Sequence, residues 1–380
     1  MKRKDAIICL GAGTSQSPFL MSAKKRGLYT ISFDRNPEAV GQEYSDVFYN
    51  VSIVDIEQIL KILENISITY NVRGVIAPIT GPALHTAYKV TDFLKLPGLS
   101  KKMVDLSTEK STMREFCNLH DLPVPNGFLI TPHQRIINSI EYPVIVKPDG
   151  TTIGKTNISY CESSQDLIKS IKTAEKISSN SKVEVEEYID GIDVTCICWA
   201  QNGIARIIVW IDEFVGIDSQ NKIVGLGIGV PSIIIGTKAQ EKAIDIVYKL
   251  ISHFHKVNSI LLISFRITAY GEPYIIEVHT DLGGDLIADV LLPAACPSFD
   301  FFDLVIKIAT GDIKTIEPVK FQPSTLGYLS GISPIGIVNY TLIQESRIDN
   351  NLRVFEKFIK ENYPNLKIYP QHSIWYTKNK

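Results

Sequence analysis

Short, uninterrupted apolar runs alternate with amphipathic stretches near the start of the chain, and this alternation constrains the fold most. Three apolar runs read as buried strands: AIICL (6–10), LYTISF (28–33) and GVIAPI (74–79). Helical patterns lie between and after them, over 17–26, 55–70 and 83–94. Strands that are apolar on both faces and alternate with helices form a parallel sheet with helices on both sides. We therefore expect a doubly wound α/β domain at the start.

The pattern changes after Pro97-Gly98, where the chain breaks and mixed α+β structure is expected. YPVIVKPDG (142–150) reads as a strand that runs into a glycine loop. ILLISFRIT (260–268) and YIIEVHT (274–280) read as the two strands of a hairpin. A chain of 380 residues accommodates two or three domains of ordinary size.

Composition excludes several classes of protein. The formal net charge is −2, so no basic excess is available to hold nucleic acid. No apolar run approaches the 18 or so residues that a membrane span needs, so no membrane partner is expected. The six cysteines are scattered without a CxxC pair, which fits a reduced, cytoplasmic setting better than a disulfide framework.

The first glycine loop, GAGTSQSP (11–18), joins a strand to a helix and could bind an anion through its backbone N–H groups. It matches the dinucleotide fingerprint poorly, because Gln16 stands where the third glycine belongs, although Asp34 lies where a ribose-binding acid would. An NAD-dependent oxidoreductase is therefore a minor alternative. The other alternative is a tight turn that only lets helix and strand pack.

Two lysines and a second loop indicate a phosphate site. Lys147 ends an otherwise apolar strand, and an ammonium there is costly unless an anion meets it. Lys110 lies in a predicted helix, and the loop DGTTIGKT (149–156) supplies Lys155 and small residues with backbone and hydroxyl donors. Each lysine alone is more often a solvated surface charge.

Two acidic segments complete the candidate site. VEVEEYIDGIDVT (183–195) is either a solvated strand edge or a hinge that pairs with an adenine edge and holds ribose hydroxyls. In the hairpin, Glu277 and His279 share one face of a strand, and Ser264 and Arg266 share a face of its partner. Glu277 and His279 could hold Mg²⁺ beside a nucleotide, although a hydrogen-bonded core histidine is an equal alternative for His279.

In this order, YPVIVKPDG, VEEYIDGIDVT and GEPYIIEVHTDLGGD resemble the ATP-grasp superfamily of carboxylate–amine ligases, over about residues 5–315. The resemblance is nearest to the biotin carboxylase-like and N5-carboxyaminoimidazole ribonucleotide synthetase-like branch. It implies ATP and Mg²⁺, an acyl-phosphate intermediate, and small-molecule carboxylate and amine substrates. It also implies three parts: a Rossmann-like domain at 1–97, a two-lobed ATP-grasp domain at 98–312 with a mobile lobe at about 141–208, and a small C-terminal α/β domain at 313–380.

The resemblance also implies roles for individual residues. Phosphate contacts would come from Lys110, Lys147 and Lys155, with Gly150 and Gly154 in the loop that closes over ATP. Adenine would meet Glu186, Glu187, Tyr188 and Ile189, ribose would meet Asp193, and metal would meet Glu277 and His279. The substrate side would be lined by Gly11, Gly13, Asp281, Gly283 and Gly284.

Three positions depart from the family pattern. Ser264 stands where an acidic metal ligand is usual, and Glu277-Val278-His279-Thr280-Asp281 replaces the usual Glu-x-Asn-x-Arg. Arg266 could take over the catalytic role of the missing arginine. A catalytically weakened nucleotide-binding protein is therefore the main alternative to an active ligase. The identity of the substrates and the oligomeric state, including a homodimer, are left open.

Overall fold

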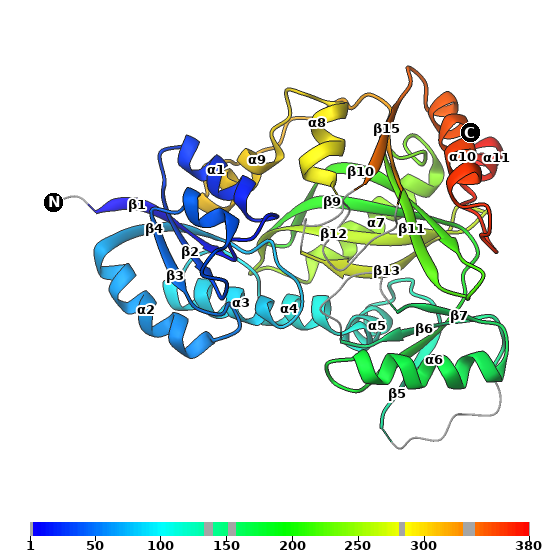
Figure 1. Ribbon diagram of the computed structural model, residues 1–380, viewed down its shortest axis with the longest axis horizontal. Coiled ribbons are helices and arrows are strands. Elements are labelled where there is room, and N and C mark those ends of the chain that lie inside the picture. The colour runs from blue at the N-terminus through cyan, green and yellow to red at the C-terminus, as the bar shows by residue number, and fades with distance from the viewer. Residues whose placement is uncertain (1–2, 133–139, 151–156, 281–285, 330–338, 380) are drawn as a thin grey trace.

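The computed structural model describes residues 3–132, 140–150, 157–280, 286–329 and 339–379. It begins with a parallel sheet in the order β3-β2-β1-β4 (Figure 1). The strands are β1 (Lys4–Leu10), β2 (Tyr29–Asp34), β3 (Val47–Asn50) and β4 (Tyr70–Ile76). The helical elements around them are α1 (Ser17–Lys25), η1 (Val40–Tyr44), α2 (Ile56–Thr69) and α3 (Ala83–Leu94).

Both faces of this parallel sheet are covered. Along β1, Ile8 and Leu10 belong to the core formed with α2 and α3, whereas Ile7 and Cys9 belong to the core formed with α1 and α9. All four side chains are fully buried, because alternate residues of a strand point to opposite faces. The expected doubly wound parallel sheet is confirmed.

Two helices lead from the parallel sheet to a small antiparallel sheet. They are α4 (Lys101–Thr108) and α5 (Lys110–Leu119), separated at Glu109. The small sheet has the order β5-β8-β6-β7, and α6 (Ser164–Ile177) covers one of its faces. Its strands are β5 (Gly127–Ile130), β6 (Val144–Pro148), β7 (Ser159–Cys161) and β8 (Val183–Glu187).

A seven-stranded antiparallel sheet forms the centre, in the order β13-β12-β9-β10-β11-β14-β15. The strands are β9 (Ile192–Gln201), β10 (Ile204–Ile217), β11 (Ile223–Val230), β12 (Asn258–Ile267), β13 (Pro273–His279), β14 (Ser324–Tyr328) and β15 (Tyr340–Gln344). The helices packed around it are α7 (Lys238–Ser252), the π-helical turn η2 (Ile287–Leu291), α8 (Leu292–Ala295), α9 (Phe301–Thr310), α10 (Ile348–Asn362) and α11 (His372–Asn379). None of the helices among the described residues is long and apolar enough to cross a membrane.

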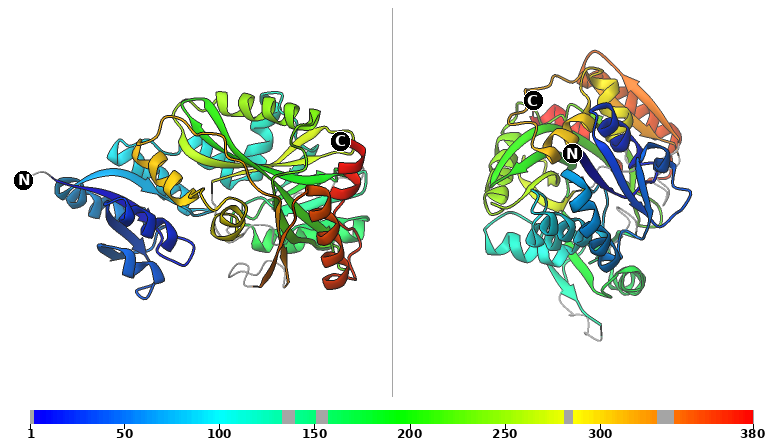
Figure 2. Two further views of the ribbon diagram at one scale, coloured as in Figure 1. Left: turned by 90° about the horizontal axis from the view of Figure 1, so that it is seen from above. Right: turned by 90° about the vertical axis from the view of Figure 1, so that its left-hand side faces the viewer.

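The last part of the chain builds onto this central sheet. β14 pairs with β11, and β15 pairs with β14. Figure 2 shows α10 and α11 at the end of the molecule opposite the parallel sheet. The domain boundaries at 97/98 and 312/313 stay predictions, but two strands from beyond residue 313 belong to the same sheet as β9 to β13.

The contact between β11 and β14 needs a glycine at position 227. A Cβ built on Gly227 would lie 2.2 Å from the carbonyl oxygen of Leu326 and 2.8 Å from the ring of Phe355. We expect Gly227→Ala to lower the free energy of unfolding by about 1–3 kcal/mol, measured by urea denaturation, because backbone atoms must move apart. Gly27→Ala is the control, since a Cβ there meets nothing within 4 Å and adds only the strain of its φ of +76°. Equal losses in the two variants would contradict this packing argument.

Candidate functional site

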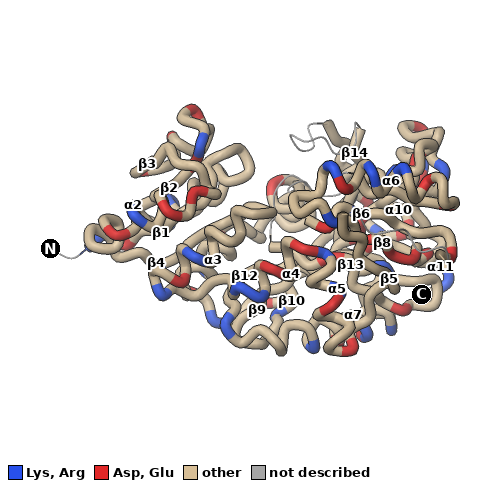
Figure 3. Tube along the Cα trace, turned by 90° about the horizontal axis from the view of Figure 1, so that it is seen from below, with Lys and Arg blue, Asp and Glu red and all other residues tan. Residues whose placement is uncertain are grey.

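A cleft of about 770 Å³ lies between the small sheet and the central sheet. Figure 3 shows basic and acidic segments interleaved around β6, β8 and β13. The cleft brings together ten residues that the sequence singled out: Lys110, Lys147, Glu186, Glu187, Tyr188, Ile189, Asp193, Ser264, Arg266 and Glu277.

The two lysines come from different elements and meet carboxylates in the cleft. Lys147 lies near the end of β6, a strand that is buried throughout, and its Nζ pairs with a carboxylate oxygen of Glu186 on β8. Lys110 is the first residue of α5, and its Nζ lies 3.7 Å from Oε1 of Glu277 on β13. Buried ammonium groups require such partners. Both cations therefore lie where an anionic ligand would also be attracted.

A buried ion pair fixes α5 against the small sheet. Arg114 of α5 binds the carboxylate of Glu184 on β8 through two nitrogens and also donates to the carbonyl oxygen of Gly127. Burial raises the pKa of Glu184 to about 7, against the opposing effect of Arg114. This pair holds the helix that carries Lys110 beside the strand that carries Glu186. The sequence analysis missed it, because the two residues are 70 positions apart.

Asp193 and Arg266 form a two-pronged ion pair at one end of the cleft. Nε and Nη2 of Arg266 donate to the two carboxylate oxygens of Asp193 at 2.6 and 2.9 Å, and Nη1 donates to the carbonyl oxygen of Ile189 at 3.1 Å. Burial lowers the pKa of Arg266, but the negative charge of Asp193 outweighs it, so that pKa is raised. The guanidinium is thus engaged beside Tyr188. This geometry favours a positioning role for Arg266 over the catalytic role expected from the sequence.

A row of oxygen-bearing side chains crosses the central sheet. Ser264 on β12 lies opposite Glu277 on β13 and opposite Thr195 on β9. The hydroxyls of Thr195 and Ser264 are 2.7 Å apart, and Thr195 donates to the buried carboxylate of Glu213 on β10. Glu213 was not predicted. Its only sequence signal is that Asp212 and Glu213 interrupt an apolar strand.

These residues fit a magnesium ion that is held mostly by phosphates. Glu277 offers a carboxylate with a side chain 35% exposed, and Ser264 offers a hydroxyl. His279 lies two residues beyond Glu277 on the same strand. No group of three or more His, Cys, Asp or Glu side chains arranged for a metal occurs among the described residues. Mg²⁺ commonly takes only one or two protein carboxylates and completes its shell with phosphates and water.

The first glycine loop is closed on itself. The N–H of Gly13 donates to Oε1 of Gln16, and the N–H of Ala12 donates to Oδ2 of Asp34. The other Asp34 oxygen accepts from the N–H of Asn36. Neither Gly11 nor Gly13 lines the cleft between the two antiparallel sheets. These contacts occupy donors and the acid that a dinucleotide would need, which disfavours the NAD alternative.

The remaining predicted positions fall outside the cleft or outside the described residues. Gly150 follows β6, and its carbonyl oxygen accepts from the N–H of Ser179. The positions beyond the described residues are Gly154, Lys155, Asp281, Gly283 and Gly284. Their roles stay predictions.

The C-terminal helix α11 begins beside the Asp193 end of the cleft. His372 is 3% exposed, and its Nε2 lies 3.3 Å from the carbonyl oxygen of Asp193. Its ring packs on Phe214. Burial lowers the pKa of His372 to about 4, against the raising effect of that carbonyl. A neutral imidazole is therefore part of the wall behind Asp193.

We expect the Asp193–Arg266 pair to behave as one unit in a double-mutant cycle. Arg266→Met leaves a poorly solvated carboxylate without its partner and should lower the free energy of unfolding by about 3 kcal/mol. Asp193→Asn should have a similar effect for the opposite charge. The double variant should lose clearly less than the sum of the two, measured by urea denaturation. Additive losses would show that the ion pair contributes no coupling.

His372 makes the stability of the folded protein depend on pH. Between pH 6.5 and 4 the unfolded chain binds a proton at this residue and the folded chain does not, so stability falls as the pH falls through this window. From pH 6.5 to 5 the wild type should lose about 1.5 kcal/mol more than His372→Phe, which keeps an aromatic ring and cannot titrate. Parallel pH profiles from chemical denaturation would contradict this expectation.

Comparison with known proteins finds relatives for the part of the chain that contains this cleft. Residues 129–308 match the family model described as D-ala D-ala ligase C-terminus. The large chain of carbamoyl phosphate synthase from Clostridium perfringens (strain SM101 / Type A) is 23% identical over 325 residues, which are 82% of this chain and 28% of the relative. This chain thus spans less than a third of the length of that curated relative.

Two solved structures share the fold along nearly the whole chain. The L-amino acid ligase from Bacillus licheniformis is 14% identical with a TM-score of 0.75, covering 98% of this chain and 100% of the other. The biotin carboxylase domain dimer of Hydrogenobacter thermophilus 2-oxoglutarate carboxylase, solved with MgADP, ADP and bicarbonate, is 14% identical with a TM-score of 0.69, covering 97% and 91%. The family model thus matches a little under half of the chain, and the two solved structures show that nearly the whole chain has their fold.

Proposed function

We propose that this protein is an ATP-dependent ligase that joins a carboxylate to an amine and releases ADP and phosphate. The observation that carries the proposal is the convergence of Lys110, Lys147 and Glu277 in one cleft between two antiparallel sheets. Two cations beside a carboxylate suit the phosphate groups of a nucleotide and the magnesium ion that accompanies them.

Each end of the cleft suits a different part of ATP. Apolar and backbone groups from Glu186 to Ile189 would receive adenine, and Asp193 would receive the ribose hydroxyls. Arg266 would hold the Asp193 carboxylate in position for this contact. Lys110 and Lys147 would then neutralise the phosphates, with help from the loop that contains Gly150, Gly154 and Lys155.

The reaction needs charge neutralisation and positioning more than covalent chemistry by the protein. The substrate carboxylate attacks the γ-phosphorus, the bond to the β,γ-bridging oxygen breaks, and ADP leaves. The amine then attacks the acyl phosphate, phosphate leaves with the bonding electrons, and the amine gives up a proton. Mg²⁺ on Glu277 and the phosphates would supply positive charge, with His279 as a further donor. Gly11, Gly13, Asp281, Gly283 and Gly284 stay proposed for the substrate side, and a homodimer stays an open proposal.

ADP release with Mg²⁺ATP, measured against carboxylates crossed with amines, tests this function. The wild type should release ADP only when both a suitable carboxylate and a suitable amine are present. Lys147→Met should lower kcat/KM by at least about 100-fold, because it removes a buried cation from the phosphate site. Lys101→Met is the matched control, since Lys101 is exposed and pairs with Asp105 on its own helix.

Three outcomes would argue against the proposal. Equal activity of Lys147→Met and the wild type would remove the lysine role. Tight Mg²⁺ATP binding with no ADP release across the panel would favour the nucleotide-binding alternative that Ser264 motivates. NAD binding without ATP binding would restore the oxidoreductase alternative.

A further inference from the structure

A second cavity, of about 660 Å³, lies where the parallel sheet meets the central sheet. Its walls come from β4, α3, the chain around Gly98, the start of β12, and α9. The described residues that line it include no Lys, Arg, Asp, Glu or His. Most are aliphatic, and among them are Ile76, Ala77, Ile260 and Ile308. The cavity therefore suits an uncharged, largely apolar group.

This cavity and the nucleotide cleft lie at different positions along the same strands. On β12, Arg266 and Ser264 line the cleft, and Ile260 lines the cavity, all on one face of the sheet. On β13, Glu277 lines the cleft, and Thr280, just beyond the strand, lines the cavity. At about 3.3 Å per residue, Ser264 and Ile260 are roughly 13 Å apart.

The direction of this path matters for the reaction. Arg266 marks the end of the cleft that is proposed for ribose, and Glu277 marks the end proposed for metal and phosphates. The second cavity lies further on in the same direction, beyond Ser264 and Glu277. A substrate that meets the γ-phosphate would therefore extend toward it.

Among the described residues, the polar side chains that line the cavity have hydrogen-bond partners, with one exception. The amide of Asn258 bonds to the indole of Trp199 and to the carbonyl oxygen of Ile308, and the Thr91 hydroxyl donates to the carbonyl oxygen of Ala87. Thr280 is 7% exposed, and its Oγ1 has no hydrogen-bond partner in the described part of the chain. Because an unpaired buried hydroxyl is costly, Thr280 is available to bond a ligand at this end.

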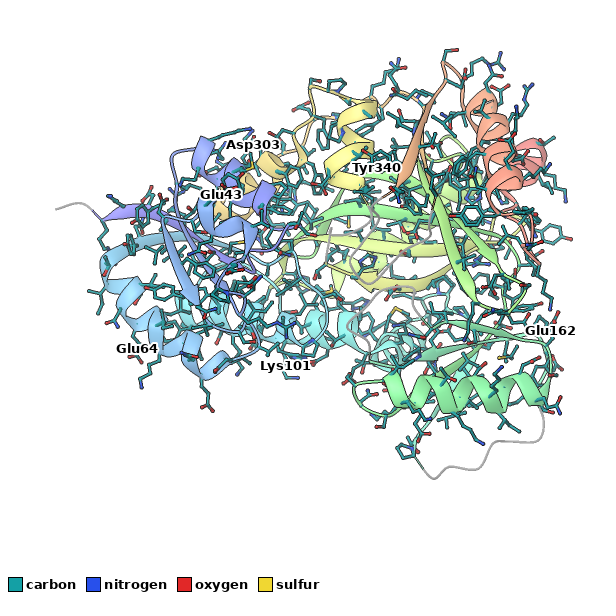
Figure 4. The ribbon with its side chains drawn as sticks, viewed as in Figure 1. Glu43, Glu64, Lys101, Glu162, Asp303 and Tyr340 are labelled. Atoms are coloured by element: carbon teal, nitrogen blue, oxygen red, sulfur yellow. The ribbon has the colours of Figure 1, made fainter. Side chains whose placement is uncertain are left out.

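Ion pairs hold the two sides of the cavity together. Arg26, next to α1, pairs with Asp303 on α9, which Figure 4 labels, and with Asp312 just beyond it. Arg73 of β4 pairs with Asp312 as well. These ion pairs fix the parallel sheet and α9 relative to each other before any ligand arrives. A preformed apolar cavity binds an apolar group without a large ordering cost.

We propose that this cavity binds an uncharged aliphatic group of one of the two substrates and so sets the substrate class of the enzyme. The proposal rests on the proposed ligase function, because that function supplies the carboxylate and amine that the aliphatic group belongs to. The Thr280 hydroxyl would bond a polar atom of the substrate near the cavity mouth. Each methylene that enters an apolar pocket typically changes specificity by about 10-fold or more.

The experiment compares three probes that carry the same branched aliphatic group with two comparators that lack it. Leucine carries both reacting groups, 4-methylpentanoate carries only the carboxylate, and isoamylamine carries only the amine. Glycine and glutamate are the comparators without a side chain and with a charged one. Each probe is titrated calorimetrically into the protein with Mg²⁺ and a non-hydrolysable ATP analogue. ADP release with Mg²⁺ATP is then assayed for pairs of probes that together supply a carboxylate and an amine.

Two variants locate the binding. Ala77→Leu adds bulk to the partly exposed cavity wall, and Thr280→Val keeps the shape of its side chain but removes the hydroxyl. Ala269→Leu, at a partly exposed alanine in the turn between β12 and β13, is the matched control. At least one aliphatic probe should bind at least 10-fold more tightly than glycine and glutamate. Ala77→Leu should remove this preference, and Thr280→Val should weaken it. Both variants should leave nucleotide affinity unchanged.

The outcomes separate this proposal from the ligase function. If the wild type releases ADP and its substrate preference is unchanged in Ala77→Leu and Thr280→Val, the ligase function is supported. The proposed role of the cavity is then contradicted. If an aliphatic probe binds, Ala77→Leu abolishes this binding, and no pair of substrates gives ADP release, the role of the cavity is supported. The ligase function is then contradicted. Absence of aliphatic preference in binding and in turnover would overturn the cavity assignment. Circular dichroism would first show that both variants fold.

Discussion

The buried ammonium of Lys147 is the constraint on which the functional region depends. β6 is buried along its whole length, so this charge needs a carboxylate from a neighbouring strand. Glu186 provides it from β8, which pairs antiparallel with β6. Arg114 and Glu184 then attach α5 to the same strand and bring Lys110 to the cleft. One electrostatic requirement thereby aligns the small sheet, a helix and the facing sheet.

Charge in the cleft is arranged in pairs instead of as a positive patch. Lys147 meets Glu186, Lys110 meets Glu277, and Arg266 meets Asp193. A ligand with only negative charge must therefore compete with carboxylates that are already present. A ligand that brings both negative phosphates and a divalent cation satisfies both members of these pairs. This balance agrees with the near-neutral composition of the chain.

The sequence predicted features that depend on neighbouring residues and missed features that depend on pairing between distant strands. Short stretches of sequence are enough to predict the apolar run of β1, the lysine at the end of β6 and the acid of β13. The parallel sheet follows from the alternation of apolar strands with helices. The ion pair between Asp193 and Arg266 joins residues 73 positions apart, so no spacing pattern reports it. For the same reason, no local pattern indicated that β14 and β15 continue the central sheet.

That continuation has a consequence for how the chain is made. β11 ends at Val230, and the strand that covers its edge begins only at Ser324. During synthesis, the nucleotide-cleft residues leave the ribosome well before this covering strand exists. Until then, β11 presents unpaired backbone groups of the kind that recruit other chains into aggregates. The nascent protein therefore passes through a stage in which its site residues are synthesised but β11 still lacks the strand that pairs with it in the finished sheet.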